Sequence, residues 1–334
     1  MKRLMKEPLP RVTSKVEGRI DRASLSEIII WLAIILLFII MSFISPTFLS
    51  VRNIVTVIKN LTTVSILAFG LTFVFLSGGF DFSQGAILLY SAILIISFNP
   101  GTVGGVFLYS LFVVGIAGLF GIFNGALIGY CHLNPFVVTL GLRNIIAGII
   151  FISTAGMTVG ATAQSPILEY LGLGRITRWL PVQTVFLIVI ALICWFILQF
   201  TLYGRKLILV GNSEIVSAYS GLKVERLKFS SYVINALLAG IAGILLGSQV
   251  SHLLPELAWH YDYDAITACA VGGISLLGGR GTLLNTISGL LLLGFINNSM
   301  ILLGLPFAWQ QILKGFVLFI AVAADVWVRR KLYE

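Results

Sequence analysis

Long apolar runs separated by short polar segments dominate this chain. The first run, 28–45, reads IIIWLAIILLFIIMSFIS, and further runs cover about 54–77, 84–98, 103–130, 135–154, 182–201, 230–250, 265–278, 283–303 and 307–328. Because a helix needs about 20 apolar residues to cross the bilayer core, the pattern predicts an all-α, polytopic membrane protein with about ten transmembrane or part-spanning helices. The runs 84–98 and 265–278 are short, so the pattern leaves open whether they cross fully.

The composition supports a membrane protein. Hydrophobic residues make up 58% of the 334 positions and charged residues only 10%, whereas soluble domains are about one quarter charged. This excludes a soluble globular protein. The formal net charge of +9 would suggest nucleic acid in a soluble chain, so the placement of the basic residues matters here.

Most of the 22 Lys and Arg fall on one side of the predicted topology. They lie in the segment 1–27, in the loop 202–229, at Arg280 and in the tail 329–334, whereas the acidic, aromatic loop at 256–264 has none. Since cytoplasmic loops carry an excess of Lys and Arg, both termini are predicted to be cytoplasmic, and nucleic acid is not needed to explain the charge.

The predicted topology divides the chain into three parts. A cytoplasmic N-terminal segment, 1–27, precedes a single transmembrane domain, 28–328, and a cytoplasmic tail, 329–334. Within the domain, the loop 202–229 is expected to be cytoplasmic, and the loops 155–181 and 251–264 are expected to be external.

Motifs for nucleotide or metal chemistry are missing from the sequence. The phosphate-binding pattern G-x-x-x-x-G-K-[ST] and the zinc pattern H-E-x-x-H do not occur. Cys131, Cys194 and Cys269 lie far apart, without the spacing of a zinc site or a disulfide framework. We therefore expect neither a catalytic residue nor a metal or cofactor in this chain.

One enzymatic alternative is an intramembrane aspartyl protease, which needs two embedded carboxylates that share a proton. Asp81 and Asp325 both lie in or beside apolar runs. Arg329 and Arg330 follow Asp325 by about one helical turn, so an interfacial salt bridge is the favoured interpretation of that residue.

The loop 202–229 contains signals for a short helix. Asn212 or Ser213 can cap its start, Glu214 suits the positive N-terminal end, and Gly221 can end it. The periodicity alone favours a helix lying on the membrane surface, and a helix that docks on another protein is the alternative.

Several motifs together carry a family resemblance. They are SGGFDFSQGA (77–86), NPFVVTLG (134–141), TLYGR with GNSE and SGLKVER (201–226), YDAITACAVGGISLLGGRGT (263–282), and NNSMILLGLP with KGFVLFIAVAAD (297–325). In this order they resemble the permease subunits of bacterial ABC sugar importers, in the ribose, xylose, arabinose and galactose branch of the branched-chain-type permeases.

The resemblance implies a multi-pass protein of the bacterial cytoplasmic (inner) membrane. It implies a second permease copy or a sister permease, two cytoplasmic ATPase subunits that bind ATP and Mg, and an external solute-binding protein that delivers a monosaccharide. It also implies a helix that couples to the ATPase, on the residues Ser213, Glu214, Ala218 and Gly221. Ile215, Val216 and Ser217 depart there from the family's usual Ala-Ala-Arg-like residues.

A gated path is expected to involve polar and glycine residues within the apolar runs. The candidates for the path or its gate are Asp81, Asn124, Thr139, Gly272, Gly273, Asn297 and Asn298. Packing is favoured for the glycines and interhelical hydrogen bonding for Asn297 and Asn298, whereas both roles stay open for Asn124. A buried Asp81 would need a partner, for which Arg143 and Lys314 are candidates.

Other transported solutes stay open at this stage: autoinducer-2, a nucleoside or a branched-chain amino acid within the same importer class. An ion-coupled secondary transporter is a further alternative of a different class.

Overall fold

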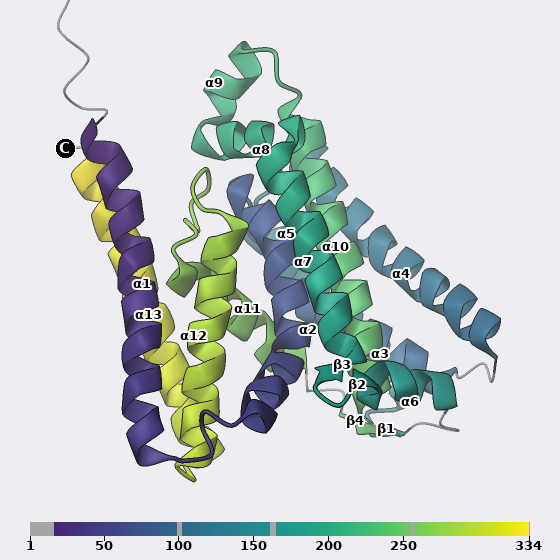
Figure 1. Ribbon diagram of the computed structural model, residues 1–334. Helices are drawn as coiled ribbons and strands as arrows, with labels where there is room; N and C mark the ends of the chain where they lie inside the picture. Colours follow the sequence, from purple (N-terminus) through teal and green to yellow (C-terminus); the bar gives the residue numbers. More distant parts are fainter. Residues whose placement is uncertain (1–16, 99–101, 161–164, 251, 255–257, 334) are drawn as a thin grey trace, which may run out of the picture.

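The computed structural model describes residues 17–98, 102–160, 165–250, 252–254 and 258–333. These residues form a helical bundle (Figure 1). Its helices are α1 (Glu17–Ile44), α2 (Val51–Leu76), α3 (Gln84–Ser97), α4 (Val103–Gly125), the π-helix η2 (Ala126–Tyr130), α5 (Pro135–Thr154), α6 (Pro166–Leu173), α7 (Val182–Phe200), α8 (Leu202–Asn212), α9 (Glu214–Tyr219), α10 (Val224–Gln249), α11 (Ala258–Gly272), α12 (Leu283–Leu302) and α13 (Phe307–Tyr333).

Four short strands form two small antiparallel sheets. β1 (Val159–Gly160) pairs with β4 (His252–Leu253), and β2 (Arg175–Thr177) pairs with β3 (Leu180–Pro181). The strands and α6 lie at one end of the bundle, and α8 and α9 lie at the other (Figure 1).

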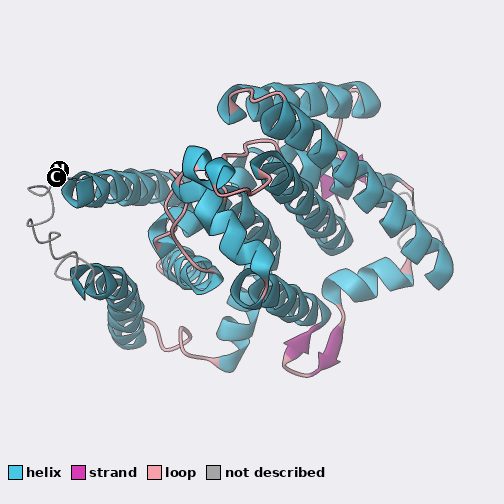
Figure 2. Ribbon diagram, turned by 90° about the horizontal axis from the view of Figure 1, so that it is seen from above, coloured by secondary structure: helices cyan, strands magenta, loops and turns pink. Residues whose placement is uncertain are grey.

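Six of the described helical segments are long and apolar enough to cross a membrane. They are α2, α4 with η2, α5, α7, α10 and α12, and the shorter apolar stretches are Ile28–Ile44, Gln84–Ser97 and Phe307–Ile320. Several helices are seen nearly end-on when the molecule is viewed from above (Figure 2). The prediction of an all-helical, polytopic membrane protein is confirmed at this level, and the count of about ten segments stays a prediction.

The helix α10 lies at the centre of the bundle, packed against α2, α3 and α4. Glycines on α10 make the close approach possible: a Cβ added at Gly243 would lie 2.3 Å from the carbonyl oxygen of Leu88, and one at Gly240 would lie 2.7 Å from Cβ of Ala117. Small residues let helix backbones pack closely in a bilayer, where dispersion contacts replace the hydrophobic effect.

The helix boundaries add detail to the predicted segments, and the placement of these segments inside or outside the membrane stays a prediction. The first helix begins at Glu17, inside the segment expected to precede the membrane domain. The expected loop 202–229 contains α8, α9 and the start of α10, and the expected loop 155–181 contains α6 and three short strands.

The helix α11 begins at Ala258, within the segment 251–264 that is predicted to be an external loop. Hydropathy placed the two acids of this region outside the span. Asp262 and Asp264 lie within α11, where Arg143 and Lys314 form ion pairs with them. A paired carboxylate costs less to bury than an isolated one, and these pairs join α11 to α5 and α13.

Candidate functional site around Asp81

The helix α2 ends at Leu76 and α3 begins at Gln84, so a non-helical segment, 77–83, interrupts the membrane domain. α3 is only 14 residues long. Asp81, in this segment, contacts Asn235, which lies about half-way along α10. The interruption therefore lies deep in the bundle, where irregular backbone is tolerated only when protein or a water-filled cavity surrounds it.

Asp81 is buried, with 1% of its surface exposed. Its Oδ1 accepts hydrogen bonds from Ser83 N and Ser83 Oγ, both at 2.7 Å, and its Oδ2 accepts one from Asn235 Nδ2 at 2.9 Å. Asn124 Nδ2, on α4, donates to Ser83 Oγ at 2.8 Å. The structure thus brings together the predicted residues Asp81 and Asn124.

A second carboxylate lies at the start of α3. Asp262 Oδ1, on α11, accepts a hydrogen bond from Gly85 N at 2.5 Å, and its Oδ2 lies 3.7 Å from Arg143 Nη2, on α5. The free N–H groups and the dipole of a helix favour negative charge at this end. The site therefore joins residues from α3, α4, α5, α10 and α11 around one helix start.

Some polar atoms of this cluster have no protein partner among the described residues. They are both amide atoms of Gln84, Oδ1 of Asn124 and Oδ1 of Asn235. Buried polar atoms in proteins are normally satisfied by protein, water or ligand. The cluster thus offers hydrogen-bond donors and acceptors to water or to a hydroxylated solute.

The cations proposed for Asp81 have other partners. Arg143 pairs with Asp262, and Lys314 Nζ lies 2.8 Å and 2.9 Å from the two carboxylate oxygens of Asp264. The prediction that either cation pairs with Asp81 is therefore wrong, because hydroxyl and amide donors hold that carboxylate.

The remaining path candidates divide by role. Thr139 is buried, donates to Pro135 O at 2.8 Å within α5, and lies one turn before Arg143 on the same helix face. A Cβ at Gly272 would lie 2.0 Å from Asn285 O, so this glycine allows α11 and α12 to pack closely. Gly273 follows it with a φ of 95°, a conformation that favours glycine.

The two asparagines of α12 lie elsewhere. Asn298 and Asn53 exchange two amide hydrogen bonds, each 2.9 Å long, which join α12 to α2. The prediction of interhelical bonding is confirmed for Asn298. The neighbouring Asn297 is half-buried, and its Oδ1 has no partner among the described residues.

The arrangement differs from an aspartyl protease dyad. The buried carboxylate beside α3 that accompanies Asp81 is Asp262, and it is ion-paired with Arg143. The side chain of Asp325 lies outside the described residues. Among the described residues, no group of three His, Cys, Asp or Glu is placed to hold a metal ion.

At the far end of the bundle, α9 forms as the sequence predicts. Ser213 caps it by accepting a hydrogen bond from Val216 N at 3.3 Å, Glu214 begins it, and Gly221 follows its end with a φ of 80°. Three apolar side chains of α9 face away from the bundle: 71% of Ile215, 63% of Val216 and 90% of Tyr219 is exposed. The predicted residue Ala218 is also exposed.

Sequence reasoning missed four polar residues of α10. These residues contact either α9 or the non-helical segment 77–83, and they are Lys228, Ser231, Tyr232 and Asn235. Their spacing places them on one helix face, and this polar face at the start of an apolar run was the available signal.

Comparison with known proteins identifies the family of this chain. The sequence pattern of the family described as branched-chain amino acid transport system / permease component matches residues 53–322, most of the chain. The chain belongs to this family. The family predicted from the sequence is thereby confirmed, and this permease is a multi-pass membrane protein that serves a transport system.

Named relatives of the permease cover most of its length. The ribose import permease protein RbsC of Bacillus subtilis (strain 168) is 34% identical over 297 residues, which are 88% of this permease and 91% of the relative. The fructose import permease protein FrcC of Rhizobium meliloti is 30% identical over 289 residues, 85% and 80% of the two chains. The autoinducer 2 import system permease protein LsrC of Shigella flexneri is 31% identical over 311 residues, 90% and 86% of the two chains. No solved structure matches the permease.

Proposed function

We propose that this permease is the membrane-spanning subunit of an ATP-binding-cassette importer and that it passes a monosaccharide across the bacterial inner membrane. The observation that carries the proposal is the alignment with a ribose import permease over nine tenths of that relative's length. The absence from the sequence of a phosphate-binding loop agrees with ATP and Mg binding on separate ATPase subunits.

The helix α9 is the proposed contact with the ATPase. Exposed apolar side chains that gather at the end of a helical bundle are typical of a surface that another protein covers. Ile215, Val216 and Tyr219 provide such a surface. Ser213 and Gly221 fix the two ends of the helix, so these side chains are presented in a defined arrangement.

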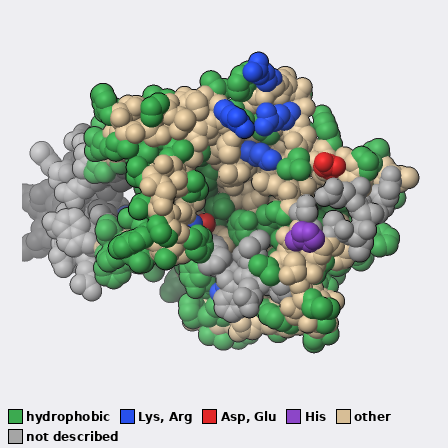
Figure 3. All heavy atoms as spheres, turned by 90° about the horizontal axis from the view of Figure 1, so that it is seen from below, with side chains coloured by type: hydrophobic (Ala, Val, Ile, Leu, Met, Phe, Trp, Pro, Cys, Tyr) green, Lys and Arg blue, Asp and Glu red, His purple; other side chains and the backbone are tan. Residues whose placement is uncertain are grey.

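The polar cluster around Asp81 is the proposed gate of the solute path. Asp81 and Asn124 meet at Ser83, beside the start of α3. Thr139 lies on α5, which reaches the same helix start through the ion pair of Arg143 with Asp262. Polar groups of this kind suit a solute rich in hydroxyl groups. The face opposite α9 is hollowed near its centre (Figure 3), which supports an opening on that side.

The expected partners follow from the importer class. They are a second copy of this permease or a sister permease, two cytoplasmic ATPase subunits and an external solute-binding protein.

Basic side chains gather on part of the face opposite α9 (Figure 3). Arg175 and Arg178 lie in or beside the exposed β2–β3 hairpin at that end. Positive charge there supports docking of a binding protein with an acidic rim.

Uptake into proteoliposomes tests the proposal. Vesicles that contain the permease, the ATPase encoded beside it and the matching binding protein are given a panel of labelled monosaccharides, with ATP supplied on the side that carries α9. We expect uptake of one sugar that requires both ATP and the binding protein. Uptake that follows an ion gradient without ATP would identify a secondary transporter instead.

Autoinducer 2 belongs in the same panel. The similarity to an autoinducer 2 import permease covers 90% of this chain, so that solute is the second candidate. Its selective uptake would keep the importer class and replace the monosaccharide.

A further inference from the structure

One face of α10 links the helix α9 to the carboxylate of Asp81. Lys228, Ser231, Tyr232 and Asn235 follow one another at helical spacing, so their side chains leave α10 on the same side. Each of the four contacts a different group, and the contacts run in order from the end of the bundle to its middle. We call these four residues the α10 polar face.

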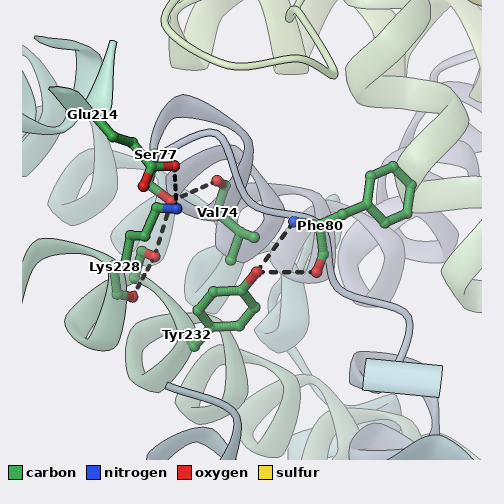
Figure 4. A network of polar contacts seen from close by, with 7 residues as sticks. Val74, Ser77, Phe80, Glu214, Lys228 and Tyr232 are labelled. Carbon is green, nitrogen blue, oxygen red and sulfur yellow. Dashed lines mark hydrogen bonds and ion pairs between the residues drawn. The ribbon is translucent and has the colours of Figure 1, made fainter. Parts of the chain in front are cut away.

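The first contact reaches α9. Lys228 Nζ forms an ion pair and hydrogen bond with Glu214 Oε1, and Glu214 is the first residue of α9 (Figure 4). Lys228 is buried. Because a buried ammonium group is costly without its partner, this pair fixes the start of α9 to α10.

The next two contacts reach the non-helical segment 77–83. Ser231 Oγ and Ser77 Oγ lie 3.2 Å apart. The hydroxyl of Tyr232 accepts a hydrogen bond from Phe80 N at 3.2 Å and donates one to Phe80 O at 3.1 Å (Figure 4). Tyr232 is fully buried, and a Cβ at Gly79 would lie 2.5 Å from its hydroxyl, so the ring and the segment fit without spare room.

The last contact reaches the candidate gate. Asn235 Nδ2 donates to Asp81 Oδ2 at 2.9 Å. A shift or rotation of α10 would therefore move the partner of this carboxylate together with the backbone of Phe80, because all of these groups are held by one rigid helix.

The end of α8 reinforces the link. Gly211 lies just before α9, and a Cβ there would lie 2.0 Å from Leu76 O and 2.5 Å from Gly279 N. Gly279 N also donates to Leu76 O at 3.3 Å, and Asn212 Nδ2 donates to Gly279 O at 3.2 Å. The chain that leads into α9 is thus packed directly against the end of α2, just before the segment 77–83, and against the non-helical segment 273–282 between α11 and α12.

We propose that the α10 polar face is the mechanical connection that converts displacement of α9 into rearrangement of the Asp81 segment. This inference rests on the proposed function, in which an ATPase moves α9. Lys228 and Tyr232 are positioning residues in this scheme: they act through Glu214 and Phe80, without touching the solute.

The substitution Tyr232→Phe tests the connection, because it keeps the buried ring and removes only the two hydrogen bonds to Phe80. The matched control is Tyr203→Phe. The hydroxyl of Tyr203, on α8, lies 2.8 Å from Ser230 Oγ, so the control also removes a hydroxyl that contacts α10, and Ser230 lies outside the α10 polar face.

The measurement is the number of solute molecules taken up per ATP hydrolysed by the complete complex in proteoliposomes, with the amount of assembled complex determined separately. We expect Tyr232→Phe to lower this ratio about fivefold or more, the effect of a coupling loss of about 1 kcal/mol, and Tyr203→Phe to leave it within about twofold. Equal ratios for the two variants in an active complex would overturn the inference. An unaltered complex without ATP-dependent uptake would overturn the proposed function, and with it the inference.

A second variant, combined with the first, distinguishes a loss of coupling from a general folding defect. Lys228→Met removes the other end of the connection and leaves Glu214 half-exposed to solvent. If both residues act through one connection, the double variant Tyr232→Phe/Lys228→Met lowers the uptake per ATP hydrolysed no further than the stronger single change does. The reason is that the effects of coupled residues are not additive. If the fold-loss in the double variant equalled the product of the two single fold-losses, the two residues would have independent structural roles, and the inference would be overturned.

Discussion

The carboxylate of Asp262 accepts a hydrogen bond, 2.5 Å long, from the backbone N–H of Gly85. Asp262 belongs to α11 and Gly85 to the first turn of α3, so 177 positions separate the two residues in the chain. The contact brings a buried acid to the positive end of a short helix beside the proposed gate. It also explains why position 85 needs a residue without a side chain.

The substitution Gly85→Ala is expected to destabilise the permease. The new Cβ would lie 2.4 Å from Asp262 Oδ1, so the carboxylate must move and its bond to the helix weakens. We expect a loss of about 2 kcal/mol in unfolding free energy, typical of overpacking at a buried site, measured as a lower unfolding temperature in detergent.

The control for this prediction is Gly141→Ala. Gly141 lies on the exposed side of α5, with no atom within 4 Å of an added Cβ. Alanine there should leave the unfolding temperature unchanged or raise it slightly, since alanine favours helix. An equal loss in both variants would contradict a specific contact at position 85.

Removing Arg143 should be more costly than removing the whole ion pair. Arg143→Met leaves the buried carboxylate of Asp262 without this partner, and we expect a loss of about 3 kcal/mol in unfolding free energy. The double variant Arg143→Met/Asp262→Asn should lose less than the sum of the single changes. A double-mutant cycle on unfolding in detergent measures the difference, and additive losses would show that the pair is not coupled.

Two buried or half-buried asparagines are expected to behave differently on substitution. Asn298→Ala removes the amide pair with Asn53 and should lower stability by about 1 kcal/mol, without changing uptake per assembled complex. Asn124→Ala removes the donor to Ser83 Oγ beside Asp81 and should lower uptake severalfold. The measurement is initial uptake rate divided by the amount of complex, and the reverse pattern would place the path near α12.

Exposed apolar side chains of α9 should matter for assembly and not for folding. Tyr219→Ser alters a residue that is 90% exposed, so the unfolding temperature of the isolated permease should stay the same. We expect binding of the ATPase to weaken about tenfold, as for an interface anchor. Titration of the ATPase against the permease in nanodiscs measures this change.

The matched control for α9 is Leu209→Ser on α8. Leu209 is 55% exposed and lies outside α9. Its substitution should leave ATPase binding within about twofold. Equal weakening by both changes would mean that the docking surface extends over α8.

The sequence predicted those features that depend on neighbouring residues. Apolar runs of membrane length predicted the helices that are long and apolar enough to cross a membrane, because each such helix satisfies its backbone hydrogen bonds internally. The short helix after Ser213 was predictable for a similar reason: the cap, Glu214 and Gly221 act within a few residues of one another.

Boundaries and polar pairings could not be predicted in the same way. Asp262 and Asp264 were expected in an external loop, because they end an acidic, aromatic segment that has no Lys or Arg and that comes just before an apolar run. Their partners, Arg143 and Lys314, lie on α5 and α13. The sequence singled out both cations as candidate partners of a buried acid, but the acid expected was Asp81. Arg143 pairs with the buried Asp262, and Lys314 pairs with the partly exposed Asp264.

The sequence alone therefore determined the class of fold, the approximate positions of the spans, the family and the short helix α9. These follow from hydropathy, from local capping and from motif order. Only the tertiary structure decided that Asp81 is held by Ser83 and Asn235 and that Lys228 joins α9 to α10. The physical reason is that a buried polar group takes its partners from whichever helices pack beside it, and packing is a property of the whole bundle.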